Sequence, residues 1–299
     1  MSTTIKDILT SQSSAIDSLD RELIVAHAIQ RPREFVLTYP EHPLTEEQCA
    51  LTESLLKRRA RHEPLAYLLG HREFFGLDFD VTPDTLIPRP ETELMIEEIV
   101  KRESGIKMQE SNDTKTCIVD VGTGSGCIII TLAKELLKNT PDIIPPLFFG
   151  VDISPEAIMV AQENARVYGL ENTVLFSPSD LLENISEQLL DPSIGSLIIT
   201  ANLPYLSREI YEASMPDVRN FEPLSALVSN EEGLQHYRRL LKQIRSILSV
   251  KKMRTQLFFE ISPEQKDGIE KLIGNYFPQA SPRTLRDLSG KYRLTIVNI

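Results

Sequence analysis

The sequence predicts a wound α/β sheet preceded by a small helical domain. From about residue 89 onward, apolar runs of strand length alternate with helical stretches, which favours parallel strands joined by crossover helices. Residues 1 to about 70 instead have helical patterns only. We therefore expect a helical domain over residues 1–72, a hairpin linker over 73–88 and an α/β domain over 89–299.

Each element is predicted by a local signal. In the helical domain, Thr45 before "EEQ" fits a capping box, and "SLDRELIVAHAIQ" predicts a second helix. The linker is alternating and aromatic, with a turn at Gly76. Pro90 and Pro155 suit first helical positions, and Ser154 suits a helix cap. The predicted strands are "TCIVDVG", "PLFFGVD", "NTVLFS", "SLIIT", "QLFFEI" and "RLTIVNI".

The composition excludes several classes of protein. The 299 residues carry a net charge of -11, whereas proteins that hold nucleic acid through its phosphates usually present a basic surface. No apolar run reaches membrane-spanning length, and the N-terminus lacks a signal-peptide core. The three cysteines and five histidines show no metal-ligand spacing. We expect a cytoplasmic protein, monomeric, without a metal, membrane attachment or direct nucleic-acid binding.

A glycine loop follows the first long strand in "VDVGTGSGCIIITLAKELL". The G-x-G-x-x-G dinucleotide fingerprint would place its third glycine at Cys127, and the Gly-Lys-Ser/Thr of a phosphate-binding Walker loop is absent. The remaining form, G-x-G-x-G after an acidic residue, is typical of S-adenosylmethionine-dependent methyltransferases. The loop alone is also compatible with a simple tight turn.

Acidic residues end the next two strands. Asp152 is placed to accept hydrogen bonds from the ribose hydroxyls of a nucleoside, and Asp180 from an adenine amino group. Either acid alone could instead be a helix-start or turn residue. Because ligands of open α/β sheets lie at the carboxyl ends of the strands, Asp120, Asp152 and Asp180 together favour a nucleoside site.

The fourth strand ends in "ANLPY", with no charged group. A planar NH2 group is a poor nucleophile, and two hydrogen-bond acceptors can aim its nitrogen at a methyl donor. The Asn202 side chain offers one acceptor and the Leu203 carbonyl the other, because Pro204 holds Leu203 extended. Tyr205 can stack on the planar group. An Asn-x-Pro turn is the structural alternative.

At this point the sequence resembles the HemK/PrmC family of protein-glutamine methyltransferases over almost its whole length. The resemblance is carried by "TLIPRPETE", "DVGTGSGCIIITLA", "VDISPEAIMVAQENA", "NLPY", "FEPLSAL", "EGLQHYRRL" and "FFEISPEQ". It implies a seven-stranded, Rossmann-like methyltransferase sheet. It also implies methyl transfer from S-adenosylmethionine to the amide nitrogen (N5) of the Gly-Gly-Gln glutamine in class-I peptide chain release factors, which the helical domain helps to bind.

The resemblance also implies roles for individual residues. The cofactor would be bound by Gly122, Thr123, Gly124, Ser125, Gly126, Asp152, Asp180, Leu181 and Asn202. Catalysis and substrate binding would use Asn202, Leu203, Pro204 and Tyr205, with Arg89, Pro90 and Thr92 at the mouth of the site. Leu203 departs from the family, which usually has proline there, so one φ restraint is lost while the carbonyl remains.

Two other functions remain open at this stage. "NLPY" is common in rRNA adenine dimethyltransferases, so adenine-N6 methylation of RNA is the alternative enzyme. A non-catalytic cofactor-binding protein is the alternative outside enzymes. The basic run Lys57–Arg61 is a solvated helix end or a docking patch, Glu222 and Pro223 line the pocket or pack a loop, and Glu260 has no evident partner.

Overall fold

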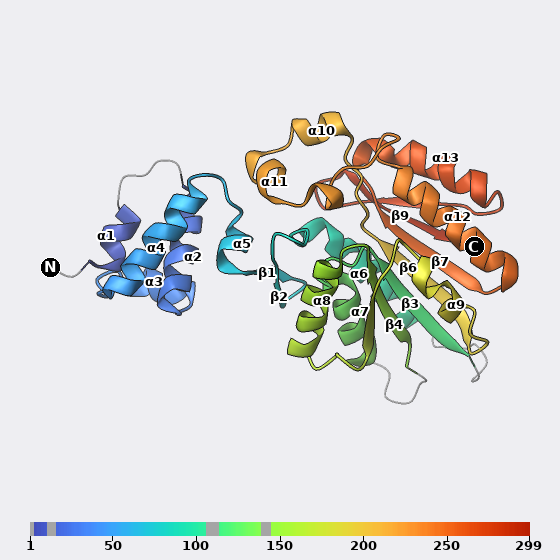
Figure 1. The fold of residues 1–299 in the computed structure, drawn as a ribbon, viewed down its shortest axis with the longest axis horizontal. Coiled ribbons are helices and arrows are strands. Elements are labelled where there is room, and N and C mark those ends of the chain that lie inside the picture. The colour runs from blue at the N-terminus through green and yellow to red at the C-terminus, as the bar shows by residue number, and fades with distance from the viewer. Residues whose placement is uncertain (1–2, 11–15, 106–113, 139–144) are drawn as a thin grey trace. The chain divides into compact units, whose positions relative to one another are not determined.

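The structure is a computed structural model that describes residues 3–10, 16–105, 114–138 and 145–299 (Figure 1). The chain divides into two compact units. The first comprises Met1–His71 with Met215–Phe221, and the second comprises Arg72–Ser214 with Glu222–Ile299.

The first unit is helical, as the sequence predicts. Its helices are α1 (Ile5–Thr10), α2 (Ser18–Ile29), α3 (Arg33–Thr38), α4 (Glu46–Arg59), α5 (Leu65–Leu69) and α11 (Pro216–Phe221). Thr45 forms the expected capping box with Gln48 at the start of α4. Apolar side chains of α2, α3 and α4, among them Ile24, Val36 and Leu55, are buried in the unit.

The basic run at the end of α4 is largely paired within its own unit. The Arg59 guanidinium lies 2.6 Å from the Asp20 carboxylate, and Arg58 lies 2.5 Å from Glu63. These contacts fit the interpretation of the run as a helix end whose cations face the negative end of the helix dipole.

The second unit contains a seven-stranded sheet and a separate two-stranded hairpin. The hairpin pairs β1 (His71–Phe74) with β2 (Leu77–Asp80), and Gly76 lies in its turn with φ 72°. The large sheet has the order β5-β4-β3-β6-β7-β9-β8. Its strands are β3 (Lys115–Val121), β4 (Leu147–Asp152), β5 (Val174–Pro178), β6 (Ile194–Ala201), β7 (Arg254–Glu260), β8 (Arg283–Arg286) and β9 (Tyr292–Asn298).

All six predicted strands are confirmed, and β8 is the one addition to the large sheet. Five neighbouring strands, β5, β4, β3, β6 and β7, are parallel, whereas β9 is antiparallel to both β7 and β8. β8 is missing from the sequence prediction because its four residues, "RTLR", contain one apolar residue, and none of them is fully buried. The hairpin is shorter than the predicted segment, and residues 81–88 form no strand.

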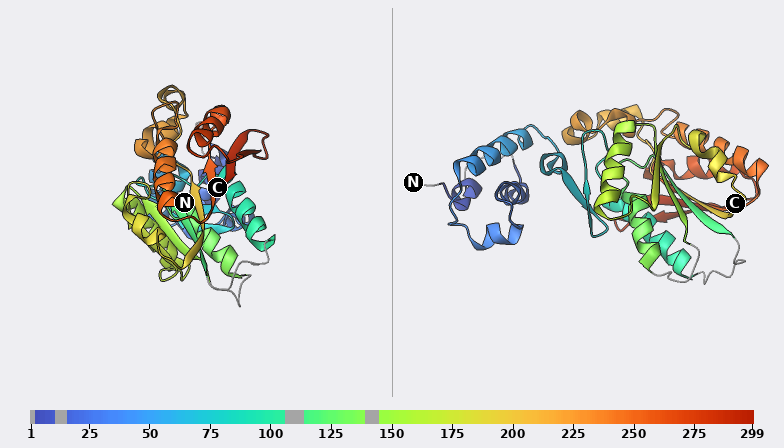
Figure 2. Two further views of the ribbon diagram at one scale, coloured as in Figure 1. Left: turned by 90° about the vertical axis from the view of Figure 1, so that its right-hand side faces the viewer. Right: turned by 60° about the horizontal axis from the view of Figure 1, so that its bottom comes forward.

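Helices cover both faces of the sheet (Figures 1 and 2). One face packs against α6 (Glu93–Gly105), α7 (Cys127–Lys138) and α8 (Pro155–Val167), and the other against α12 (Gln235–Val250) and α13 (Lys266–Tyr276). Strand side chains alternate between the two cores: Phe258 enters the first, and Leu257 and Phe259 enter the second. The shorter helices are η1 (Pro90–Thr92), η2 (Glu183–Ile185), α9 (Ser186–Leu189), α10 (Arg208–Glu212), η3 (Leu224–Ala226) and η4 (Pro263–Gln265).

The strand order determines where a ligand can bind. From β3 the chain crosses to β4 on one side, and it later returns to β6 on the other side of β3. Crossover helices diverge at such a point and leave a crevice above the carboxyl ends of the strands. Asp152 and Asn202 lie there, at the ends of β4 and β6.

Candidate active site

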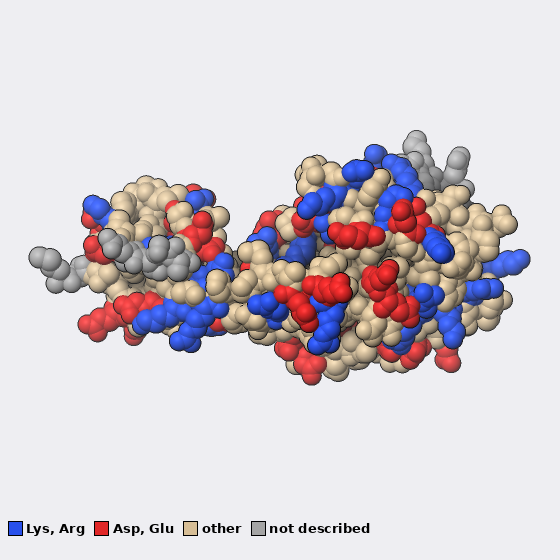
Figure 3. Space-filling model, turned by 90° about the horizontal axis from the view of Figure 1, so that it is seen from above, with Lys and Arg blue, Asp and Glu red and all other residues tan. Residues whose placement is uncertain are grey.

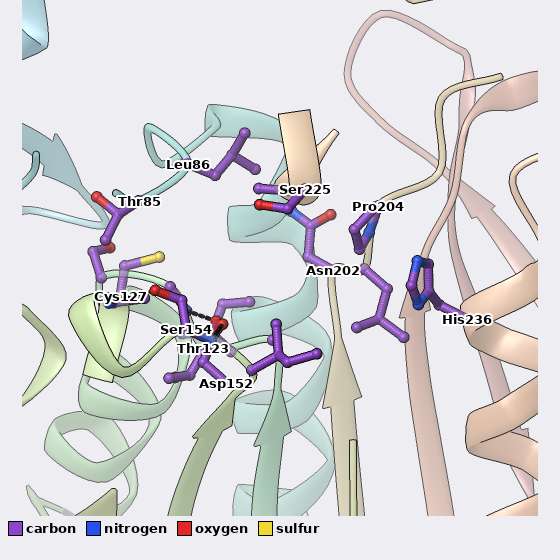
Figure 4. Close-up of a pocket in the computed structure, with 18 of the residues that line it drawn as sticks. Thr85, Leu86, Thr123, Cys127, Asp152, Ser154, Asn202, Pro204, Ser225 and His236 are labelled. Atoms are coloured by element: carbon purple, nitrogen blue, oxygen red, sulfur yellow. Dashed lines mark hydrogen bonds between the residues drawn. The ribbon is translucent and has the colours of Figure 1, made fainter. Parts of the chain in front are cut away.

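A pocket opens above the ends of β3, β4, β5 and β6 (Figure 4). It holds about 1050 Å³ of empty space, its open mouth included. Its walls include the predicted residues Arg89, Thr92, Gly122, Thr123, Gly124, Ser125, Asp152, Asp180, Leu181, Asn202, Leu203 and Pro204. Gly126, Pro90 and Tyr205 are not among the lining residues.

The glycine loop is fixed from below by a buried carboxylate. Asp120 is fully buried at the end of β3 and accepts hydrogen bonds from the Thr123 hydroxyl at 2.7 Å and the Thr200 hydroxyl at 2.8 Å. Burial raises the pKa of Asp120 to about 6, against the opposing effect of these two donors. Asp120 therefore anchors the loop and does not line the pocket.

Gly122 has a geometric reason to be glycine. Its φ is +74°, and a Cβ there would lie 3.0 Å from Leu203 Cδ2. Leu203 itself is buried, with 4% of its surface exposed. The leucine that replaces the usual family proline therefore fills space directly against the glycine loop.

Asp152 connects this loop to the start of α8. One carboxylate oxygen accepts from the Gly124 N–H at 2.9 Å, and the other from the Ser154 N–H at 3.0 Å (Figure 4). Burial raises the pKa of Asp152. Each oxygen keeps a further lone pair, so the carboxylate can also accept the two hydroxyls of a ribose.

The third strand end carries an ion pair that the sequence did not indicate. The Asp180 carboxylate lies 2.5 Å from the Arg239 guanidinium of α12. Arg239 and His236 both line the pocket, and burial together with Arg239 lowers the pKa of His236. Only one Asp180 oxygen faces Arg239, so the other remains available to an amino group.

The end of β6 presents a buried acceptor atom without a partner. The Asn202 Nδ2 donates to the Thr92 hydroxyl at 3.2 Å, whereas its Oδ1 is buried and has no hydrogen-bond partner. Figure 4 shows Asn202 and Pro204 together in the pocket wall, beside His236. A buried unpaired carbonyl is costly unless a ligand completes its hydrogen bonding.

Tyr205 is not among the residues that line the pocket. Its hydroxyl donates to the Glu260 carboxylate at 3.4 Å, and its carbonyl accepts from the Gln265 Nε2 at 3.1 Å. Both contacts hold the chain that follows Asn202. Stacking of Tyr205 on a substrate remains a prediction.

Glu260, which had no evident partner in the sequence, is part of this network. It ends β7, has 2% of its surface exposed, and accepts from the Thr92 hydroxyl at 2.6 Å. Burial raises its pKa to about 7. The missed signal is the sheet order: β7 is the neighbour of β6, so its end lies beside Asn202.

Arg89 is held by a buried acid. Its guanidinium lies 2.6 Å from Glu222, whose side chain is 1% exposed, and Glu222 also accepts from the Ile87 N–H at 3.3 Å. Glu222 thus packs a loop, while Arg89 still lines the pocket. Pro90 begins η1, as predicted for a first helical position.

The sheet, the glycine loop and Asp152 define a class of protein, the S-adenosylmethionine-dependent methyltransferases. Residues 112–268 match the family described as a methyltransferase domain. The solved hMettl16 catalytic domain, in complex with an RNA hairpin from the MAT2A 3'UTR, has a similar fold: its TM-score is 0.51 at 19% identity, with 78% of each chain covered. The half-buried carboxylate of Asp152 and the buried Oδ1 of Asn202 supply hydrogen-bond acceptors that fit this cofactor.

The particular family follows from the whole chain. Residues 3–70 match the PrmC N-terminal domain. The release factor glutamine methyltransferase of Bacillus anthracis is 33% identical over 290 residues, which cover 96% of this chain and 95% of that protein. The enzyme of the same name from Koribacter versatilis is 38% identical over 76% of this chain and 73% of its own. The chain belongs to the release factor glutamine methyltransferase family.

The sequence predicts neither membrane attachment nor a metal site, and the structure describes residues 3–10, 16–105, 114–138 and 145–299. In that part of the chain no helix has the length and apolar character needed to cross a membrane. Within the same residues, no group of three His, Cys, Asp or Glu side chains is placed to hold a metal ion.

Proposed function

We propose that this chain methylates the side-chain amide nitrogen of the Gly-Gly-Gln glutamine in class-I peptide chain release factors. The observation that carries the proposal is the unpartnered Oδ1 of Asn202, buried in the pocket wall. A primary amide carries two N–H donors, so one can bond to this oxygen and the other to the Leu203 carbonyl. The names of the relatives support a release factor as the substrate.

One group of pocket residues would bind the cofactor, and another would bind the substrate glutamine. Asp152 and the glycine loop would hold the ribose and amino-acid portions of S-adenosylmethionine, which supplies an electrophilic methyl group on a sulfonium. Asn202 would hold the glutamine nitrogen in line with that methyl. Such orientation replaces the strong base that an amide would otherwise need, and positioning of this kind lowers barriers by several kcal/mol, up to about 10.

Adenine-N6 methylation of RNA remains the second candidate, because Leu203 gives the pocket an "NLPY" strand end. The charge opposes it. The net charge is -11, and Figure 3 shows Lys and Arg interspersed with Asp and Glu over the described residues of the face it draws. Binding to nucleic acid favours a continuous basic surface. We propose that the chain binds no nucleic acid and acts in the cytoplasm as a monomer, with its helical unit helping to bind the release factor.

Methyl transfer from radiolabelled S-adenosylmethionine tests the proposal. Purified release factor, the same factor with its Gly-Gly-Gln glutamine changed to alanine, and ribosomal RNA are offered in parallel. We expect label in the wild-type factor only. Label in RNA would replace the proposal with adenine methylation, and label in none of the three would favour a cofactor-binding protein.

The variant Asn202→Ala tests the role of the strand end. It removes the acceptor oxygen, so we expect kcat to fall about 100-fold, as for a misplaced reacting atom. Cofactor affinity, measured by calorimetry with S-adenosylhomocysteine, should change much less. Equal loss of affinity and turnover would place Asn202 in the cofactor site alone.

A further inference from the structure

A chain of hydrogen bonds runs from a buried carboxylate to the proposed substrate acceptor. The Thr92 hydroxyl donates to Glu260 Oε2 at 2.6 Å, and the Asn202 Nδ2 donates to the same hydroxyl at 3.2 Å. The three residues come from three elements: η1, the residue after β6, and the end of β7. They are separated by 110 and 168 residues along the sequence, so only the fold brings them together.

The donor-to-acceptor direction of these hydrogen bonds follows from the chemistry of the Thr92 hydroxyl. Thr92 has a single O–H proton, and a carboxylate can only accept hydrogen bonds. When that proton is donated to Glu260, the remaining lone pairs of the hydroxyl face Asn202 and require a donor there. The Asn202 NH2 group supplies that donor, and its carbonyl oxygen is turned away from Thr92 and left without a partner.

We propose that Glu260 and Thr92 are positioning residues that keep the amide of Asn202 turned with its oxygen toward the substrate. The inference rests on the proposed function, because the need for an acceptor arises from a substrate amide or amino group. An NH2 group in the same place would face the substrate N–H that is meant for this oxygen, so donor would meet donor and no hydrogen bond could form.

The surroundings of Glu260 bury it and hold it in place. Its backbone carbonyl accepts from the Tyr237 hydroxyl, and its Oε1 accepts from the Tyr205 hydroxyl at 3.4 Å. The titratable and charged groups that act on it or feel its charge are Tyr205 after β6, Tyr237 of α12, Arg293 of β9, Glu91 of η1 and Cys127 of α7. Arg293 favours the charged carboxylate, whereas burial and Glu91 disfavour it.

Protonation of Glu260 would remove the requirement that Thr92 donates its proton to this carboxyl group. A neutral carboxyl can donate to Thr92, whose proton can then point to the oxygen of a flipped Asn202 amide. Burial raises the pKa of Glu260 to about 7, so this reversal falls within a measurable range of pH. Activity should therefore decline as pH falls through about 7.

A matched pair of variants at Thr92 tests this hydrogen-bond relay from Glu260 through Thr92 to Asn202. Thr92→Ser keeps the hydroxyl and Thr92→Val removes it at nearly constant volume. We expect Thr92→Val to lower kcat about 100-fold, because a turned Asn202 amide would misplace the reacting nitrogen of the substrate, and Thr92→Ser to restore most of it. S-adenosylhomocysteine affinity should be equal in both. If Thr92→Val retains the wild-type kcat, or if Thr92→Ser is as impaired as Thr92→Val, the relay is wrong.

The pH profile separates positioning from packing. Wild-type kcat should show an acid limb with a midpoint near 7, and the residual rate of Glu260→Gln should lack that limb because glutamine does not titrate. A purely structural Glu260 would leave the limb in place in the variant. The same limb in both proteins overturns the proposal.

A measurement that needs no substrate keeps this inference distinct from the proposed function. In heteronuclear NMR spectra the side-chain NH2 signals of Asn202 are assigned by their loss in Asn202→Ala. They should shift with pH around the midpoint of Glu260 in the wild type, and not in Glu260→Gln or Thr92→Val. Titration of these signals without methylation of a release factor would refute the function and support the relay. Methylation with signals that do not titrate would refute the relay alone.

Discussion

Gly233 is the position at which one added methyl group should do most damage to the site. It lies before α12 with φ +84°, and a Cβ built there would stand 2.0 Å from the Tyr205 carbonyl oxygen and 2.2 Å from Gln265 Nε2. Gln265 donates to that carbonyl at 3.1 Å and to the Glu232 carbonyl at 2.9 Å. Gly233→Ala must therefore displace the backbone of the strand end that carries Asn202.

The size of the effect follows from these contacts. A left-handed backbone costs an alanine roughly 1–2 kcal/mol. Loss of the two hydrogen bonds of Gln265 adds about 1 kcal/mol each, and the backbone shift adds about 1 kcal/mol. The expected loss of unfolding free energy is about 4 kcal/mol, a large part of the roughly 5–15 kcal/mol that stabilises a typical domain.

Gly290 provides the matched control. It has φ +81°, but nothing lies within 4 Å of a Cβ built there, so Gly290→Ala should lose only the roughly 1–2 kcal/mol of the backbone term. Urea unfolding followed by far-ultraviolet circular dichroism measures both variants. If Gly233→Ala loses no more stability than Gly290→Ala, an added Cβ at position 233 does not displace the Tyr205 backbone, and the reasoning is refuted.

Two further predictions concern the glycine loop and pH. Gly122→Ala should weaken S-adenosylhomocysteine binding about tenfold in calorimetry, since its Cβ would press on Leu203 Cδ2 at 3.0 Å and its φ of +74° disfavours alanine; unchanged affinity would contradict this. Because the pKa of Glu260 is raised by burial from 4.5 to about 7, the folded state keeps a proton that the unfolded state releases between these pH values. Wild-type stability relative to Glu260→Gln should thus be highest below about pH 4.5 and fall by about 3 kcal/mol as pH rises to about 7, whereas a pH-independent difference would refute the shift.

The sequence by itself determined the features that depend on neighbours along the chain. Apolar runs of strand length predicted the strands β3, β4, β5, β6, β7 and β9, because a strand buried on both faces is apolar along its length, which is a local property. Pro90, Ser154 and the Thr45 capping box predicted helix starts for the same reason. The glycine loop and Asp152 were recognisable because their chemistry is contained in one strand–loop–helix segment.

Only the tertiary structure decided which distant groups meet. Glu260 had no evident partner in the sequence. Parallel pairing of β6 with β7 places it close to Asn202, and the Thr92 hydroxyl forms a hydrogen bond with each of them. Arg239 reaches Asp180 across 59 residues, and Tyr205 turns its hydroxyl to Glu260 instead of lining the pocket. Strand order and helix packing fix these contacts through burial and hydrogen bonding, and no local pattern encodes them. The sequence thus predicts the type of chemistry, and the fold determines which side chains orient it.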